Sequence, residues 1–100
     1  MFVGYEQIAV SNTVLTVAAL TIPPGAAYAE LQAGPAGGVR YTMDNTTNPT
    51  QTFGMVLSGS ALLNIITKEF IIEDIRRIRF IRDGAVDTLL NIHYSGGGIT

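Results

Sequence analysis

The sequence predicts an all-β fold, namely a single antiparallel β-sandwich, jelly-roll-like, with about eight short strands. Val, Ile, Thr, Tyr and Phe dominate its apolar segments, and these residue types favour strands over helices. Glycine or proline interrupts the segments at roughly 8–12-residue intervals, a spacing typical of sandwiches and barrels. Because 100 residues can build one hydrophobic core and not two, residues 1–100 are expected to form one domain.

The N-terminal region is expected to supply two strands. Residues 2–10 form the first strand, which ends at the turn pair Ser11-Asn12. Residues 13–22 form the second, which is closed by two prolines and a glycine that cannot continue a ladder. The first twenty residues either complete the sandwich as a strand or form an arm laid across a neighbouring molecule.

Alternation of apolar and polar residues predicts the faces of the next two strands. Apolar and polar side chains alternate over residues 27–33 and over residues 39–44, so each strand is expected to have one buried and one solvent-exposed face. The side chains expected to face the core are Ala29, Leu31, Ala33, Val39, Tyr41 and Met43. Between the two strands, residues 34–38 contain three glycines and a proline, which force a turn.

A polar stretch rich in Thr and Asn, residues 44–52, follows and is the first candidate for contact with a partner. Asp44, Asn45 and Asn48 resemble a cation-binding loop, but calcium loops usually carry several acids and this stretch has one. Asx-turn hydrogen bonding explains these residues without a metal. In the next strand, residues 52–57, Gly54 is expected to mark a bulge or a close backbone approach.

The C-terminal part is expected to contain three more strands, over residues 61–67, 77–82 and 88–95. The dipeptide Asp83-Gly84 follows the second of these, and it predicts that the last two strands pair as a hairpin. Residues 96–100 are expected to be a flexible, glycine-rich tail.

Residues 68–82 are also compatible with a helix, because isoleucines recur there at helical spacing and Glu73 lies four residues before Arg77. The composition argues against this reading, since five Ile and two Phe with no Ala or Leu are typical of strands. We therefore favour a short turn or single helical turn over residues 73–76, followed by a strand.

Four arginines, Arg76, Arg77, Arg79 and Arg82, are interpreted as a salt-bridged strand face or a subunit interface. The stretch from Lys68 to Asp87 holds five basic and five acidic residues, so its net charge is zero. Nucleic-acid binding needs an uncompensated basic patch, and nucleic acid is therefore not expected as a partner. Arginine is enriched at protein interfaces and pairs with carboxylates through two hydrogen bonds, which fits a contact surface.

Apolar side chains are expected on both faces of the last two strands. Ile81 alternates with Phe80, and Leu89 alternates with Leu90, so each pair points to opposite faces. This arrangement indicates either an oligomer contact or a second face that is buried within the domain. Ile81 and Leu89 are therefore candidate interface residues.

No catalytic residue, cofactor or metal site is predicted, and the protein is not expected to be an enzyme. His93 is the only histidine, and a general base would need both a nucleophile and an orienting acid beside it. Because cysteine is absent, thiolate nucleophiles and Cys-based zinc sites are excluded. The longest apolar stretch, residues 14–22, falls far short of the ~20 residues that a membrane-spanning helix requires, so no membrane is expected as a partner.

Three segments of the chain resemble small β-sandwich proteins of tailed-phage virions, including head decoration or cement proteins. These segments are TIPPGAAYAELQA, VRYTMDNTTNPT with the following GMVL, and RIRFIRDG with the following TLLNIHYSGG. The likeness covers residues 21–97 and lies in strand order and pattern, so it carries no catalytic residues. It implies a stable β module that binds capsid or other virion subunits, often as a dimer or trimer. The contact regions that it implies are residues 44–52, residues 76–82 and the termini.

The resemblance implies a structural virion protein, most simply a capsid decoration or stabilising protein that bridges neighbouring subunits of the major capsid protein. Such a protein is made in the cytoplasm of the bacterial host and ends in the virion. An alternative in the same class is a tail or head–tail connector accessory protein. An alternative of another class is a carbohydrate-binding module, which would expose aromatic side chains along one face; the chain has no Trp and four Tyr.

Overall fold

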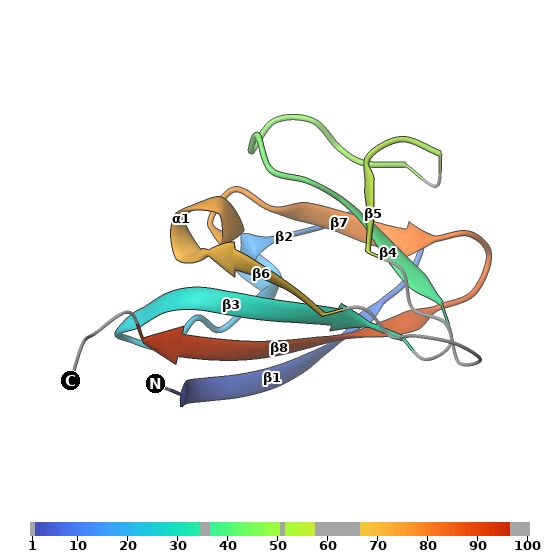
Figure 1. Ribbon diagram of the computed structural model, residues 1–100. Helices are drawn as coiled ribbons and strands as arrows, with labels where there is room; N and C mark the ends of the chain where they lie inside the picture. Colours follow the sequence, from blue (N-terminus) through green and yellow to red (C-terminus); the bar gives the residue numbers. More distant parts are fainter. Residues whose placement is uncertain (1, 35–36, 51, 58–66, 97–100) are drawn as a thin grey trace.

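Two antiparallel sheets of four strands each face one another in the computed structural model, which describes residues 2–34, 37–50, 52–57 and 67–96 (Figure 1). In spatial order, the first sheet contains β1 (Phe2–Val10), β8 (Thr88–Gly96), β3 (Ala26–Ala33) and β6 (Thr67–Ile71). The second sheet contains β2 (Leu15–Thr16), β7 (Arg79–Asp83), β4 (Gly38–Thr42) and β5 (Met55–Leu57). The predicted all-β sandwich is confirmed.

The order of the strands is that of a jelly roll. The first strand pairs with the last, β2 pairs with β7, β3 with β6, and β4 with β5, and all four pairs are antiparallel. This pattern arises when one long hairpin is rolled up so that its two arms lie together along the roll. The structure therefore has the jelly-roll-like arrangement that the sequence predicted.

The predicted hairpin at Asp83-Gly84 is wrong, because β7 and β8 lie in different sheets. Gly84 does adopt the positive φ, +93°, that the turn signal implies. A turn signal specifies where the chain reverses and not which strand becomes the hydrogen-bonded neighbour. Here β8 pairs with β1 and β3, whereas β7 pairs with β2 and β4.

Strand boundaries also differ from the prediction, most clearly at three places. The second strand is only two residues long, because the Thr16 hydroxyl accepts a hydrogen bond from the Ala18 amide and begins a single 3-10 turn, η1 (Val17–Ala19). Strand β5 begins at Met55 and not at residue 52, because the chain bends at Gly54. The strand expected over residues 61–67 lies outside the described residues except for Thr67, where β6 begins.

Residues 68–82, whose sequence is compatible with a helix or a strand, contain a single helical turn, α1 (Ile72–Ile75), followed by β7. The favoured interpretation is confirmed and the long helix is wrong. Strand β6 precedes the helical turn and runs to Ile71, so this part of the chain contributes to both sheets. The turn between the sheets is anchored by Ile75 and Ile78, which are both fully buried.

The N-terminal residues complete the sandwich. Strand β1 pairs with β8 from Phe2 to Val10, with one register shift near Gly4. Of the two alternatives that the sequence left open for this region, the structure shows the strand and not the arm. Residues 97–100 of the expected tail lie outside the described residues, and Gly96 belongs to β8.

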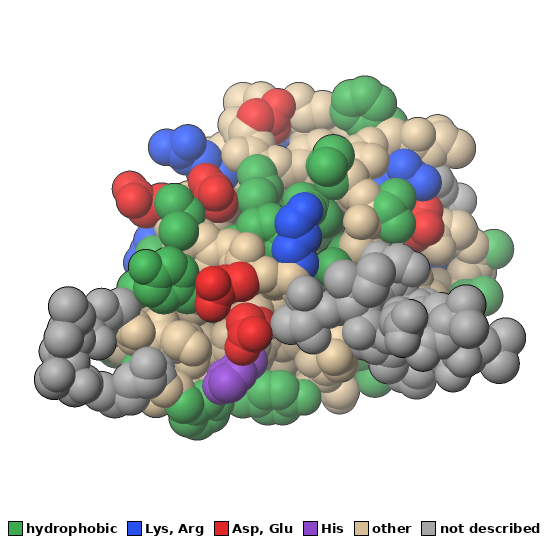
Figure 2. Space-filling view, viewed as in Figure 1, with side chains coloured by type: hydrophobic (Ala, Val, Ile, Leu, Met, Phe, Trp, Pro, Cys, Tyr) green, Lys and Arg blue, Asp and Glu red, His purple; other side chains and the backbone are tan. Residues whose placement is uncertain are grey.

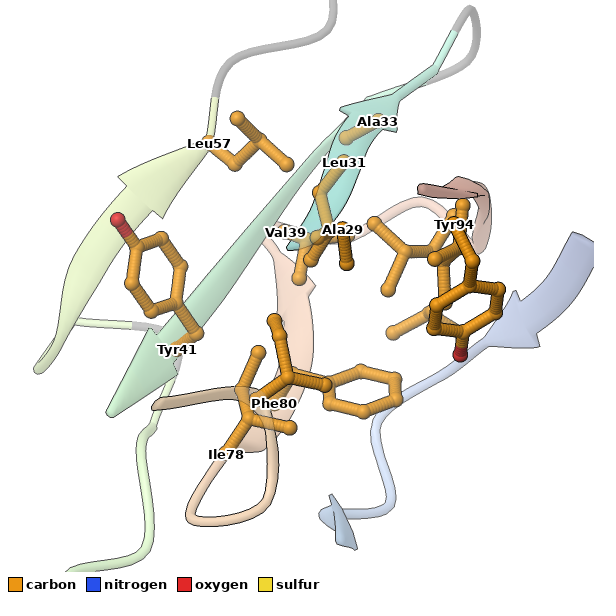
Figure 3. Packing of buried hydrophobic residues seen from close by; sticks show 13 residues of the cluster. Ala29, Leu31, Ala33, Val39, Tyr41, Leu57, Ile78, Phe80 and Tyr94 are labelled. Carbon is orange, nitrogen blue, oxygen red and sulfur yellow. The ribbon is translucent and has the colours of Figure 1, made fainter. Parts of the chain in front are cut away.

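The core fills the space between the two sheets (Figure 3). The alternation predicted from the sequence is found in β3 and β4, whose inward residues are buried, and β8 alternates in the same way. The buried cluster consists of Val10, Ala29, Leu31, Ala33, Val39, Tyr41, Leu57, Ile75, Ile78, Phe80, Leu90, Ile92 and Tyr94. Tyr41 packs edge-on against Phe70 with ring centroids 5.5 Å apart, so an aromatic pair links the two sheets.

One polar group within this core is the hydroxyl of Tyr94, which donates a hydrogen bond to the Glu6 carboxylate at 2.6 Å. Burial, reinforced by the hydrogen bond to Glu6, raises the pKa of Tyr94 far above its usual range. The same carboxylate accepts the Thr21 amide at 2.9 Å, which ties the chain that follows η1 to strand β1.

Tyr94→Phe is expected to lower the free energy of unfolding by about 1.5–3 kcal/mol, the usual contribution of a hydrogen bond to a charged group. Urea denaturation followed by circular dichroism measures the change. Tyr28→Phe is the matched control, because Tyr28 is exposed and its hydroxyl makes no hydrogen bond within the described residues. Equal stability of the two variants would contradict the role given to the Tyr94 hydroxyl.

Candidate partner-binding site

The polar loop of residues 44–48 is ordered by the side chain of Asp44. One carboxylate oxygen accepts the backbone amides of Thr46 and Thr47 at 3.0 and 2.8 Å, and the other accepts the Thr47 hydroxyl. This is the Asx turn that the sequence predicted. Asn45 takes a left-handed conformation with φ of 62°, which asparagine tolerates better than most residues. The Thr47 hydroxyl, together with the amides of Thr47 and Thr46, holds the pKa of Asp44 well below its usual range.

Arg79 fastens this loop to the second sheet. Its guanidinium donates to the Asn48 side-chain oxygen at 2.7 Å and to the backbone carbonyls of Asn45 and Thr46 at 2.8 and 3.2 Å. The backbone also connects the two regions, because the Asn45 amide donates to the Arg77 carbonyl at 3.1 Å. The structure therefore brings the predicted residues Asp44, Asn45, Asn48, Arg77 and Arg79 together at one end of the sandwich.

Gly54 closes the other side of the same region by a tight backbone approach, as the sequence predicted. Its φ is +124°, and a Cβ atom placed there would lie 3.0 Å from the Tyr41 carbonyl oxygen and 3.3 Å from Pro49. The Arg40 guanidinium donates to the Gly54 carbonyl at 3.1 Å and forms a salt bridge with Asp83 at 2.9 Å. Two arginines from adjacent strands thus hold the chain on both sides of the loop.

An apolar pocket of about 500 Å³ lies beside this loop. Its lining consists of Tyr41, Thr42, Thr52, Phe53, Gly54 and Met55. Phe53 and Met55 are 57% and 60% exposed, and the neighbouring Val56 is also exposed. The Thr42 hydroxyl donates to the Thr47 carbonyl, so the pocket and the polar loop share one wall. An apolar centre with a polar rim is the usual composition of a protein–protein contact.

The remaining predicted residues lie elsewhere. Ile81 is only 6% exposed and lies opposite Arg40 in the β4–β7 ladder, so its outer position is covered within the domain. Arg82 forms a salt bridge with Asp87. Arg76 is exposed directly after α1, and Leu89 is half-buried on the first sheet, opposite Ala9 of β1.

Sequence reasoning missed two features. The first is the apolar pocket, whose only signal was the presence of Phe53 and Met55 directly after a polar stretch. The second is the outer face of the first sheet, where Phe2, Tyr5 and Tyr28 are exposed. The alternation did assign Tyr28 to the solvent-exposed face of its strand, but it could not show that β1, β8 and β3 are neighbours.

Within the described ranges, no three His, Asp or Glu side chains gather in a way that could hold a metal ion. In the same part of the chain, no helix is long and apolar enough to cross a membrane. Comparisons with protein-family models, with curated proteins and with solved structures gave no match.

Gly54→Ala is expected to destabilise the fold by more than Gly84→Ala. Both glycines have positive φ, so both substitutions carry the conformational cost of roughly 1–3 kcal/mol. Only at position 54 would the new methyl group also press against the backbone of β4, because nothing lies within 4 Å of the corresponding position at Gly84. Thermal denaturation of the two variants measures the difference; a larger loss at Gly84 would contradict the close approach.

The stability of the loop is expected to depend on pH through Asp44. Its folded pKa lies below the unfolded value of about 3.9, so its stabilisation is complete above that value and is lost as the pH falls toward the folded pKa. The wild type should therefore be more stable than Asp44→Asn near neutral pH, and the difference should shrink below about pH 4. Urea midpoints at several pH values test this, and a difference that does not change with pH would contradict it.

Proposed function

We propose that this protein is a structural component of a tailed-phage virion, most simply a capsid decoration protein that bridges neighbouring subunits of the shell. The observation that carries the proposal is the exposed apolar pocket at Phe53 and Met55 with the ordered polar loop beside it. A loop held by Arg79 and Asp44 loses little conformational freedom when a partner binds, and such preorganisation favours affinity.

The chemistry of the pocket supports binding and not catalysis. Its lining offers no carboxylate and no imidazole that could act as a general base. The chain as a whole carries few charges, 14% of its residues, and exposes aromatic and aliphatic side chains on both sheets. Exposed apolar patches of this kind mark contact surfaces on soluble proteins.

The jelly-roll order supports the same class of function, because this architecture is common among viral capsid and lectin domains. A decoration protein occupies many identical sites on a shell, so a modest contact at each site sums to strong retention when the protein binds as an oligomer. We accordingly expect a dimer or trimer in solution, which sedimentation at high concentration tests. The connector alternative differs in copy number, since quantitative mass spectrometry of purified virions would find few copies of a connector and many of a decoration protein.

Phe53→Ser combined with Met55→Ser is expected to weaken retention on capsids of the encoding phage by more than tenfold, because it removes the apolar centre of the contact. Retention is measured by co-sedimentation of the purified protein with expanded capsids. Val86→Ser is the matched control: Val86 is 55% exposed in the turn between β7 and β8, away from the pocket.

Circular dichroism must show that both proteins are folded. If the folded double variant binds capsids as tightly as Val86→Ser does, the pocket is not the contact. If the wild-type protein is absent from purified virions and does not bind capsids, the proposed function is wrong.

A further inference from the structure

The outer face of the first sheet carries a regular array of aromatic and hydrogen-bonding side chains. Three strands contribute to it, and their registers place Tyr5 of β1 and Glu30 of β3 on either side of His93 of β8. In the next row, Gln7 and Gln32 flank Asn91 in the same way. The residues that alternate with these on β3 and β8 belong to the core, so the array faces away from it.

Side chains of the array fix one another. The Tyr5 hydroxyl and the Gln7 amide both donate to the Asn91 side-chain oxygen, at 3.1 and 2.8 Å. Because the oxygen of Asn91 accepts both of these hydrogen bonds, its NH₂ group is the part of the side chain that can act as a donor. His93 Nδ1 lies 3.2 Å from the Glu30 carboxylate, and the Phe2 ring packs on the imidazole with centroids 4.7 Å apart.

These side chains surround an open pocket of about 290 Å³, lined by Tyr5, Glu30, Gln32, Asn91 and His93. The volume is just below the range of roughly 300–1,000 Å³ that is usual for ligand pockets, so the pocket suits a small ligand or part of a larger one. Figure 2 shows the single histidine at the surface with acidic side chains beside it. Two exposed aromatic rings, Phe2 and Tyr5, border the polar groups.

The negative charge of this face limits the kinds of ligand that it can bind. Strands β1, β3 and β8 contain no Lys and no Arg, whereas Glu30 and its β6 neighbour Glu69 supply carboxylates. Phosphates, nucleic acids and acidic sugars would be repelled from such a surface. The ligand that fits is uncharged and carries both hydroxyl groups and a flat apolar face.

We infer that this pocket, named here the sheet groove, binds a neutral saccharide. The C–H face of a sugar ring is apolar and stacks on an exposed aromatic ring such as Tyr5. Its hydroxyls are both donors and acceptors, so adjacent hydroxyls can donate to the Glu30 carboxylate and accept from the Asn91 NH₂ group. The hydrogen bonds from Tyr5 and Gln7 hold Asn91 in place before the ligand arrives, which lowers the entropic cost of binding.

The sheet groove is independent of the proposed assembly role. It lies on the β1-β8-β3 face of the first sheet, whereas the apolar pocket at Phe53 and Met55 is formed by β4, β5 and the segment before β5 in the second sheet. A protein attached through one sheet would keep the other free to contact glycans.

Titration of the ¹⁵N-labelled protein with oligosaccharides tests the inference. The neutral probes are cellotetraose, maltotetraose, chitotetraose and N-acetyllactosamine, and the anionic probes are 3′-sialyllactose and inorganic phosphate. At least one neutral probe is expected to shift the Asn91 side-chain amide signals together with backbone signals of β1, β3 and β8. Tyr5→Ala and Asn91→Ala are each expected to raise the dissociation constant of that probe at least tenfold.

Val86→Ala is the control, and it should bind the same probe as the wild type does. Circular dichroism and thermal melting establish that each variant is folded. The inference is overturned if no neutral probe shifts these signals, if only the anionic probes do, or if folded Tyr5→Ala and Asn91→Ala bind unchanged. It is also overturned if Tyr5→Ala abolishes self-association, because the face would then be covered by a second copy of the chain. None of these results depends on whether the protein is found in virions.

Discussion

Strand β8 lies between β1 and β3 and hydrogen-bonds to both along most of its length. Its inward residues Leu90, Ile92 and Tyr94 are among the most buried in the protein, and its outward residues Asn91 and His93 form the centre of the sheet groove. One strand therefore joins the core to the face for which we propose ligand binding. A change that shifted its register by one residue would exchange these two sets and destroy both.

Two arginines, Arg40 and Arg79, stabilise the fold through hydrogen bonds within the domain and are not free to contact a partner. Arg79 and Arg40 are directed at backbone carbonyls and at Asn48 and Asp83, and between them they fix the loop of residues 44–48 and the bend at Gly54. The apolar pocket keeps its shape because these cations hold its surroundings. In a small protein that lacks disulfides, such hydrogen bonds from arginine help to make a long connection rigid.

Local patterns in the sequence predict most of the strands and the buried faces of β3 and β4, because alternation depends only on neighbouring residues. They also predicted the Asx turn at Asp44 and the close approach at Gly54, which are set within a few residues of chain. Pairing between distant segments left no such signal. The Asp83-Gly84 turn signal therefore could not show that β7 and β8 lie in different sheets, and no local pattern predicts the hydrogen bond between Tyr5 and Asn91, 86 residues apart. The hydrogen bonds from Arg79 to the loop of residues 44–48 could not be predicted for the same reason, because more than 30 residues separate the partners.

The rolled hairpin also has a consequence for synthesis. Every ladder between the named strands joins one of β1 to β4 with one of β5 to β8. A ribosome that has released only the first half of this chain has thus released four strands that have no ladder to form with one another. Their edges and apolar faces stay uncovered until the second half is synthesised. The nascent chain can therefore aggregate or bind chaperones for longer than the nascent chain of a protein built from local hairpins.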